Sequence, residues 1–223
     1  MKASTSRTED TESLQDLGRA SIQIIHDLKN QLNGLKLYAT FLRRRIEKSD
    51  RPPDEQETVL KLISGLDRAA SDLSTLVEFG RDMELKKQPG FEVSKILRNL
   101  CSNFQDGEAQ VVCHSDAESI QGEFDHSRLT DAFRWLFAGA VKFKRTDDGA
   151  GAVNVAVKTD HNNAVVEWSG LRNLDHDPFR SFAGSDEIRL SLARKIIENH
   201  GGSAKLADHK FVVVLPLSGS ESV

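Results

Sequence analysis

The residues best suited to chemistry lie in one short segment, Ile24-Ile-His-Asp-Leu-Lys-Asn-Gln-Leu-Asn-Gly-Leu35. On a helix, His26, Asn30 and Asn33 fall at positions i, i+4 and i+7 and share one face. Asp27 follows the histidine directly. An exposed imidazole near neutral pH is a nucleophile, and a neighbouring carboxylate can hold its tautomer and accept its proton. The segment is compatible with a nucleophilic histidine, although helical spacing alone equally fits a merely solvated side chain.

The residues around this segment follow the pattern of a long bundle helix. Apolar residues recur at steps of three, four or seven: Leu14, Leu17, Ile24, Leu28, Leu32, Leu35, Ala39, Leu42 and Ile46. Pro52 and Pro53 end this helix, and a second apolar series from Val59 to Val77 predicts another. A two-helix hairpin leaves apolar residues exposed, which two copies can cover as a four-helix bundle. We therefore expect a homodimer through residues 14–86, after a polar tail over residues 1–13.

The remainder of the chain, residues 87–223, predicts a second domain. The spacing indicates helices at about 93–104, 127–142 and 187–199, and strands at 110–114, 152–158, 164–168, 204–206 and 210–215. Helices and a mixed sheet in this order are typical of a two-layer α/β sandwich. The predicted fold class is thus α+β: a helical hairpin that forms a dimeric four-helix bundle, followed by an α/β sandwich.

The run from His26 to Leu32 resembles the H box of two-component sensor histidine kinases: histidine, acid, apolar, basic, then Thr or Asn, with Leu later. The resemblance implies that His26 is the phosphorylated residue, that Asp27 assists as a general base, and that Asn30 positions water in a phosphatase reaction. Gln31 departs from the family, where many members have proline. In the family, receiver domains dock around the histidine and the lower first helix, which implies partner contacts at Lys29, Asn33, Lys36 and Leu37.

Residues 87–223 resemble the GHKL-type ATP-binding domain of the same family, but with its motifs degraded. Trp135 and Gly139 stand where the family has asparagines, the second of which binds magnesium. Trp168 replaces the aspartate that accepts a hydrogen bond from adenine, and Glu187 and Arg189 replace two glycines that cradle phosphate. Glycine has no side-chain ligand and indole has no acceptor. We expect a degenerate domain in which Trp135 and Trp168 fill the vacated pocket.

These features predict a histidine phosphotransferase that carries a phosphoryl group on His26 between response-regulator receiver domains without using ATP. It would need no cofactor or metal ion of its own, because the receiver supplies the magnesium. Two alternatives stay open. One is an enzyme, either a divergent histidine kinase or a receiver phosphatase that uses Asn30. The other is a pseudokinase binding module that sequesters a receiver or a kinase.

Composition argues against several other classes. Charged residues make up 29% of the chain with both signs mixed and a net charge of −4, which gives no footprint for nucleic acid or an anionic membrane. The longest apolar runs, such as Phe211–Leu215, are too short to span a bilayer, and residues 1–10 lack a signal peptide's apolar stretch. We expect a cytoplasmic protein in which Cys101 and Cys113 are unpaired core residues.

Overall fold

The computed structural model describes residues 3–48, 52–105, 111–115, 119–145 and 151–217. The chain forms two compact units, Met1–Arg81 and Asp82–Val223. This division confirms a helical hairpin followed by an α/β sandwich, with the boundary a few residues before the predicted one. In the described part of the chain, no helix is long and apolar enough to cross a membrane.

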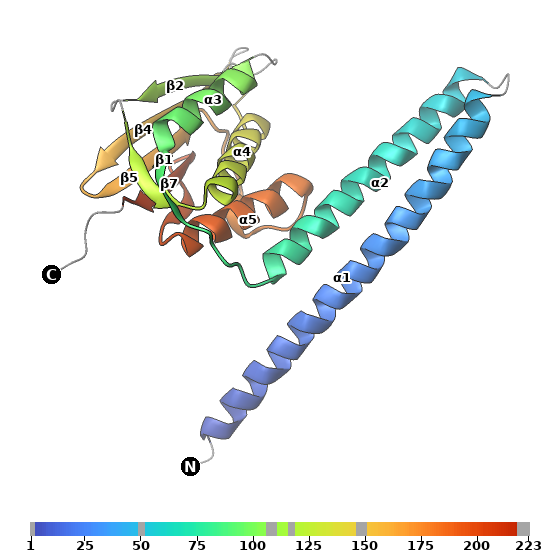
Figure 1. The fold of residues 1–223 in the computed structure, drawn as a ribbon, viewed down its shortest axis with the longest axis horizontal. Helices are drawn as coiled ribbons and strands as arrows, with labels where there is room; N and C mark the ends of the chain where they lie inside the picture. The colour runs from blue at the N-terminus through green and yellow to red at the C-terminus, as the bar shows by residue number, and fades with distance from the viewer. Residues whose placement is uncertain (1–2, 49–51, 106–110, 116–118, 146–150, 218–223) are drawn as a thin grey trace. The chain divides into compact units, whose positions relative to one another are not determined.

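The first unit is an antiparallel hairpin of α1 (Ala3–Glu47) and α2 (Pro53–Gly80), drawn in blue and teal in Figure 1. Helix α1 begins at Ala3, inside the segment that was predicted as a polar tail. Residues 3–17 contain no proline or glycine, so nothing in their sequence interrupts the helix. Helix α2 begins at Pro53, where the missing N–H of proline costs no helical hydrogen bond.

A narrow row of side chains joins the two helices of the hairpin. Ala39 and Ile46 of α1 and Val59 of α2 are buried between them. Lys36 Nζ lies 2.5 Å from Asp67 Oδ1 and adds a surface ion pair across the same contact. Among the described side chains of α1, Ala39 and Ile46 are the buried ones, so one hairpin covers only part of its own apolar surface.

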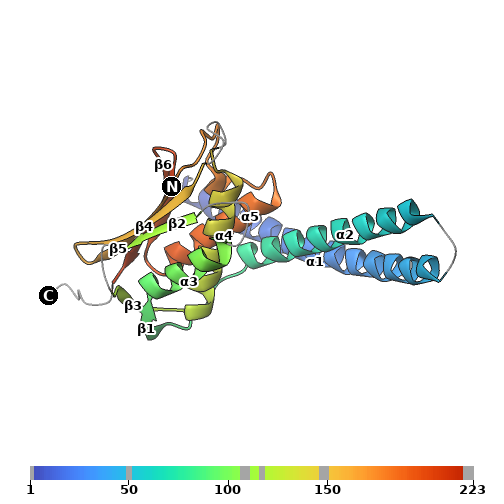
Figure 2. The same cartoon turned by 90° about the horizontal axis from the view of Figure 1, so that it is seen from above.

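The second unit contains a five-stranded sheet in the order β2-β4-β5-β7-β6, in which only β2 and β4 run parallel. The strands are β2 (Val111–Ser115), β4 (Val153–Asp160), β5 (Asn163–Ser169), β6 (Ser203–Ala207) and β7 (Lys210–Pro216). Helices α3 (Val93–Gln105), α4 (His126–Lys142) and α5 (Ser185–Asn199) pack together on one face of this sheet (Figure 2). The alternation of buried and exposed residues along β4 and β7 agrees with a sheet covered on one face.

Three short elements of this unit escaped prediction. Strands β1 (Gln88–Glu92) and β3 (Gln121–Phe124) form a separate antiparallel pair, and η1 (Pro178–Arg180) is a 3-10 helix before α5. Pro89 and Gly90 within β1 are turn residues in sequence terms, and Gly90 has a φ of 82°. Because of these two residues, β1 shows no alternation of apolar and polar residues from which a strand could be predicted.

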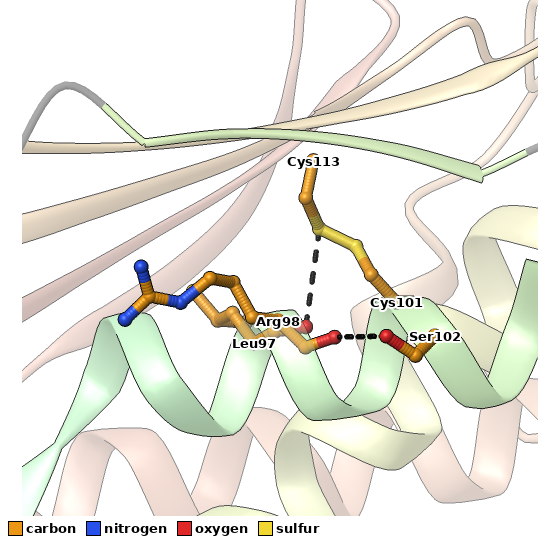
Figure 3. Close-up of a disulfide and its surroundings, with 5 residues drawn as sticks. All are labelled: Leu97, Arg98, Cys101, Ser102 and Cys113. Atoms are coloured by element: carbon orange, nitrogen blue, oxygen red, sulfur yellow. Dashed lines mark hydrogen bonds between the residues drawn. A yellow bond between two sulfur atoms is a disulfide. The ribbon is translucent and has the colours of Figure 1, made fainter.

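A disulfide joins Cys101 of α3 to Cys113 of β2, with the Cα atoms 6.4 Å apart (Figure 3). The expectation of two unpaired core cysteines was wrong. It rested on the expected compartment and not on geometry, since spacing cannot show that both side chains point into the same helix–sheet layer. Cys101 is 3% exposed, and Cys113 Sγ also lies 3.8 Å from the carbonyl oxygen of Leu97.

Candidate functional site

His26 lies on α1 with half of its side chain exposed, and the neighbouring Asp27 is exposed to 60%. His26 Nδ1 lies 3.6 Å from Asp27 Oδ1 and 3.4 Å from Asn30 Nδ2. Among the described residues, no hydrogen bond or ion pair engages Nε2. The imidazole thus has polar neighbours at one nitrogen and an open approach at the other, which is the arrangement a nucleophilic histidine needs.

The carboxylate beside the histidine has a second partner that the sequence analysis did not identify. Gln23, one helical turn earlier, donates a hydrogen bond from Nε2 to Asp27 Oδ1 at 3.1 Å. The spacing of Gln23 and Asp27 at i and i+4 could have indicated this contact, because such pairs meet on a helix surface.

The four predicted partner contacts divide between two sides of α1. Asn33 and Leu37 are exposed and follow His26 at helical steps that keep them on its face, and Leu37 is 54% exposed. Lys36 instead turns toward α2, where it pairs with Asp67. Lys29, seven residues before Lys36, falls on that same side and is half-buried. The structure therefore brings Asn33 and Leu37 to the histidine face and directs the lysines elsewhere.

Phe41 extends the histidine face and was missed in the sequence. It follows Leu37 by one helical turn and is 51% exposed. Two large apolar side chains are thus displayed on the same side of α1 as the candidate nucleophile. The signal was available as an i, i+4 step, but the interpretation of α1 concentrated on its other apolar residues.

A separate apolar stripe is exposed along the hairpin. Leu28, Leu35 and Leu42 follow one another at intervals of seven on α1 and are exposed to 45%, 54% and 46%. Leu62 on α2 is exposed to 51%. A heptad interval keeps side chains on one face, and that face lies away from His26. The hairpin thus displays the histidine face and an exposed apolar face on different sides of α1.

In the second unit, Gly139, the position expected to lack a metal ligand, packs against a neighbouring helix. Gly139 of α4 is buried, and a Cβ atom added there would lie 2.9 Å from both Cδ atoms of Leu190 on α5. Leu190 itself is fully buried. The two helices therefore approach so closely at this point that α4 has no room for a larger side chain unless Leu190 moves.

Trp168 is part of the core, as the sequence predicted. It is fully buried on β5, with its ring 6.1 Å from Phe133 and 5.6 Å from Phe137 of α4, measured between centroids. Its Nε1 is buried and has no hydrogen-bond partner among the described residues, a cost that the aromatic packing must offset. Trp135 is only half-buried, so the prediction that both tryptophans fill the core was wrong for this one. Helical spacing from Phe133 turns its side chain away from that cluster.

The segment that leads into α5 is fixed to the core. Phe179 of η1 is 2% exposed and its ring centroid lies 5.0 Å from that of Phe211 on β7. The buried Ser191 hydroxyl lies 3.1 Å from the carbonyl oxygen of Phe179 and 3.0 Å from that of Ser181. At the start of α5, Glu187 Oε1 lies 3.3 Å from His176 Nε2. Glu187 and Arg189, which the resemblance sets against two glycines, thus lie on α5 directly after a segment that is packed against the core.

Asp125 and His200 fix the N-terminal end of α4. Asp125 Oδ1 accepts a hydrogen bond from the backbone N–H of Arg128 at 3.0 Å, and Oδ2 accepts one from that of Lys86 at 2.9 Å. Burial raises the pKa of Asp125, but these backbone hydrogen bonds outweigh it and hold the pKa below its usual value. His200 Nε2 accepts from the Asp125 N–H at 3.0 Å, and burial lowers the pKa of His200. The side chains of Asp125 and His200 thus hold the backbone around the start of α4 by hydrogen bonds.

The described residues contain no group of three or more His, Cys, Asp or Glu side chains that could hold a metal ion. The imidazole, carboxylate and carboxamide on α1 therefore form the strongest candidate site in the described structure, and the chemistry they suit is group transfer to nitrogen.

No protein-family model matches the chain, and no curated protein sequence matches it. Solved structures do. Full-length ShkA in complex with AMPPNP is 17% identical with a TM-score of 0.69, over 89% of this chain and 45% of ShkA. The Acinetobacter baumannii histidine kinase AdeS is 17% identical with a TM-score of 0.58, over 85% of this chain and 97% of that structure. The catalytic domain of histidine kinase ThkA is 20% identical with a TM-score of 0.51, over 60% of this chain and 97% of that domain.

The chain thus spans less than half of ShkA but nearly all of the AdeS and ThkA structures. At these identities the likeness establishes the fold alone. The protein has the fold of a histidine kinase, a helical hairpin followed by an α/β sandwich.

Proposed function

We propose that this protein is a histidine phosphotransferase of a two-component phosphorelay, which carries a phosphoryl group on His26 between receiver domains. The observation that carries the proposal is the exposed imidazole, whose Nδ1 lies beside Asp27 and Asn30 while no described residue engages Nε2. The histidine-kinase fold around it supports a role in the same kind of signalling.

The transfer step follows from this geometry. The Nε2 lone pair of His26 attacks the phosphorus of a receiver's acyl phosphate, the bond from phosphorus to the receiver's carboxylate oxygen breaks, and that carboxylate leaves with the electron pair. The resulting imidazolium loses its Nδ1 proton, for which Asp27 is the nearest carboxylate. Magnesium belongs to the receiver in this scheme, so the hairpin needs no metal ion. The reverse step delivers the phosphoryl group to a second receiver.

We propose further that the sandwich unit does not use ATP. Three observations support this, each at a position that the family resemblance assigns to nucleotide binding: Gly139 has no ligand atom and faces Leu190, Trp168 is buried among aromatic rings, and Glu187 places a carboxylate where phosphate would lie. Each lost contact costs about 1–3 kcal/mol of binding free energy. Three such losses sum to about 3–9 kcal/mol, which lowers the affinity by a factor of roughly a hundred or more.

We also propose that the protein is a homodimer through the hairpin. Leu28, Leu35 and Leu42 form an exposed stripe too regular to be scattered surface residues, and a second copy presents the same stripe. A 290 Å³ groove near the end of α1 and the start of α2 adds the apolar side chains of Leu42, Ile46 and Val59 to this surface, with Asp54, Glu55 and Thr58 lining the rest of it.

For receiver docking, the structure favours the histidine face of α1 over the predicted set of four residues. Asn33 and Leu37 remain contact candidates and Phe41 joins them, because all three are exposed on that face. Lys36 is already paired with Asp67, so its ammonium is less available to a partner.

The test is transfer of label from a radiolabelled phospho-receiver of the source organism. We expect His26→Ala to abolish labelling, whereas the matched control His114→Ala, which removes another exposed histidine, should leave it intact. Label on the His26→Ala protein would refute the site assignment. Labelled ATP with magnesium, run in parallel, should give no label, and label in that arm would establish the divergent kinase instead.

One observation favours receiver phosphatase activity as a second candidate. Asn30 presents an exposed carboxamide next to the imidazole, where it could also position a water molecule. Asn30→Ala should then slow release of inorganic phosphate from the receiver more than it slows label transfer. If the wild type neither takes label nor releases phosphate, yet binds the receiver, the protein is a binding module.

A further inference from the structure

The hydrogen bond between Gln23 and Asp27 links a third side chain to the candidate nucleophile. Gln23 Nε2 donates to Asp27 Oδ1 at 3.1 Å, and the same Oδ1 atom lies 3.6 Å from His26 Nδ1. All three residues lie within little more than one turn of α1 and are exposed. A nucleophile, its base and a group that orients the base are the three parts of an activated nucleophile.

We propose that Gln23 is a positioning residue for His26: by holding the Asp27 carboxylate, it favours the imidazole tautomer that leaves Nε2 unprotonated. The inference rests on the proposed function, in which His26 accepts the phosphoryl group. Gln23 lies outside the motif that resembles the H box, so it is an addition to the residues named there.

The two neighbours of Nδ1 favour opposite tautomers. A carboxylate can only accept, so the negative charge of Asp27, 3.6 Å from Nδ1, favours the form with the proton on Nδ1 and a bare, nucleophilic Nε2. Asn30 Nδ2 is a donor and lies 3.4 Å from Nδ1. It stabilises the form in which Nδ1 has no proton and Nε2 carries it, and an Nε2 that carries the proton cannot attack phosphorus.

Gln23 acts on this balance through Asp27. The aspartate is 60% exposed, so without a restraint its carboxylate would sample several rotamers in water. The hydrogen bond from Gln23 removes part of that freedom at the oxygen nearest the imidazole. Glutamine and aspartate at i and i+4 stabilise one another on helix surfaces, which makes the contact worth about a twofold change in a population.

The first readout needs no partner protein. Nitrogen-15 chemical shifts of the His26 ring, assigned with a His26→Ala sample, give the fraction of each neutral tautomer above pH 8. Gln23→Met keeps the length and helix propensity of the side chain and removes its donor. We expect the fraction with Nδ1 protonated to fall about twofold in Gln23→Met. In an Asp27→Asn background, the same substitution should change nothing, because there is no carboxylate left to hold.

The second readout is the reactivity of His26 toward phosphoramidate, a small phosphoryl donor. Nε2 attacks phosphorus, the P–N bond of the reagent breaks, and ammonia leaves with the electron pair and is protonated, while the Nδ1 proton passes to Asp27. Gln23→Met should label about twofold more slowly than wild type, again only when Asp27 is present.

The outcomes separate this inference from the function on which it rests. An unchanged tautomer ratio in Gln23→Met, or an equal change in the Asp27→Asn background, would overturn the role of Gln23. Failure of every receiver to label the wild type would instead count against the phosphorelay, since neither readout here uses a receiver.

Discussion

The two units of this protein differ in the solvent exposure of their distinctive side chains. The hairpin leaves His26, Asp27 and Asn30 in solvent and also exposes a stripe of leucines on another face of α1. The sandwich buries its distinctive residues, Trp168 and Leu190, completely. A regular stripe of exposed apolar side chains marks a surface for contact with another molecule, whereas buried side chains contribute to packing. The difference supports the proposal that phosphotransfer and dimer formation take place on the hairpin, and that the sandwich does not use ATP.

Loss of the dimer is the largest effect that would distinguish the role of the hairpin from that of the sandwich. Leu35→Asp places a charge in the middle of the exposed apolar stripe, once in each copy, and burial of an unpaired carboxylate costs several kcal/mol of association free energy. We expect sedimentation to show a dimer for the wild type and a monomer for this variant, with the sandwich still folded.

Leu60→Asp is the matched control for that experiment. Leu60 is 50% exposed on α2, close to the 54% of Leu35, but lies outside the heptad series Leu28, Leu35 and Leu42 on α1. It should leave the dimer intact. A wild-type monomer, or equal loss of the dimer in both variants, would contradict the proposal that the exposed leucine stripe of the hairpin forms the dimer.

The disulfide gives the next largest effect, and it should be confined to the sandwich. Cys101 and Cys113 are twelve residues apart in sequence. A disulfide that closes a loop of that size stabilises a fold by about 3 kcal/mol. A Cys101→Ser and Cys113→Ser double variant should unfold with a free energy lower by that amount in denaturant. The dimer should be unaffected. Equal stability of the variant and the oxidised wild type would show that the bond is not formed in solution.

Sequence patterns predicted the parts of this molecule that depend on local spacing. The heptads of α1, the alternation of Val153, Val155 and Val157, and the burial of Trp168 all follow from periodicity or residue size. Contacts between segments could not be found in this way. The pairing of Cys101 with Cys113 depends on how α3 lies over β2, which no single segment encodes.

The site shows the same limit on a smaller scale. His26, Asp27 and Asn30 were identified because they stand in one motif, and the structure brings their polar atoms together. Lys36 was assigned to the partner surface because it is near in sequence, yet its ion pair with Asp67 on α2 depends on how two helices meet. Residues chosen by proximity along the chain are reliable only within one face of one element.

A pair of glycines tests how differently the two units are packed. A Cβ atom added to Gly65 of α2 meets nothing within 4 Å, whereas one added to Gly139 of α4 meets Leu190 at 2.9 Å. Gly65→Ala should therefore stabilise its helix by about 0.5–1 kcal/mol, the usual gain in helix propensity. Gly139→Ala should lose that gain to crowding, and overpacking costs about 1–3 kcal/mol. Thermal unfolding of the two variants measures the difference, and a stabilised Gly139→Ala protein would mean that the space beside α4 is open.

The smallest effect concerns pH and should again belong to the sandwich. His200 is 2% exposed, with Nδ1 next to the carbonyl oxygen of Ile196 at 2.8 Å and Nε2 accepting from the Asp125 N–H, so the native fold holds it neutral. Burial is the main cause that lowers its pKa below the ordinary 6.5, and the charge of Lys87 acts in the same direction, while Ile196 and Asp125 oppose both. Below pH 6.5 the unfolded chain therefore binds a proton that the folded chain resists.

The contribution of His200 to stability should thus be complete above pH 6.5 and be lost as the pH falls toward its lower folded value. Glu167 and Asp125, whose pKa values are also lowered, lose their contributions as the pH falls through and below their ordinary 4.5 and 3.8, so they act mainly below pH 5. We expect denaturant unfolding to show a free energy that decreases over this interval in the wild type and less steeply in His200→Gln. That variant should also be less stable by about 1–3 kcal/mol at pH 7, because its side chain cannot satisfy both buried partners as well as the ring does. An equally steep pH dependence in His200→Gln would assign the effect to other groups and leave His200 as a packing residue.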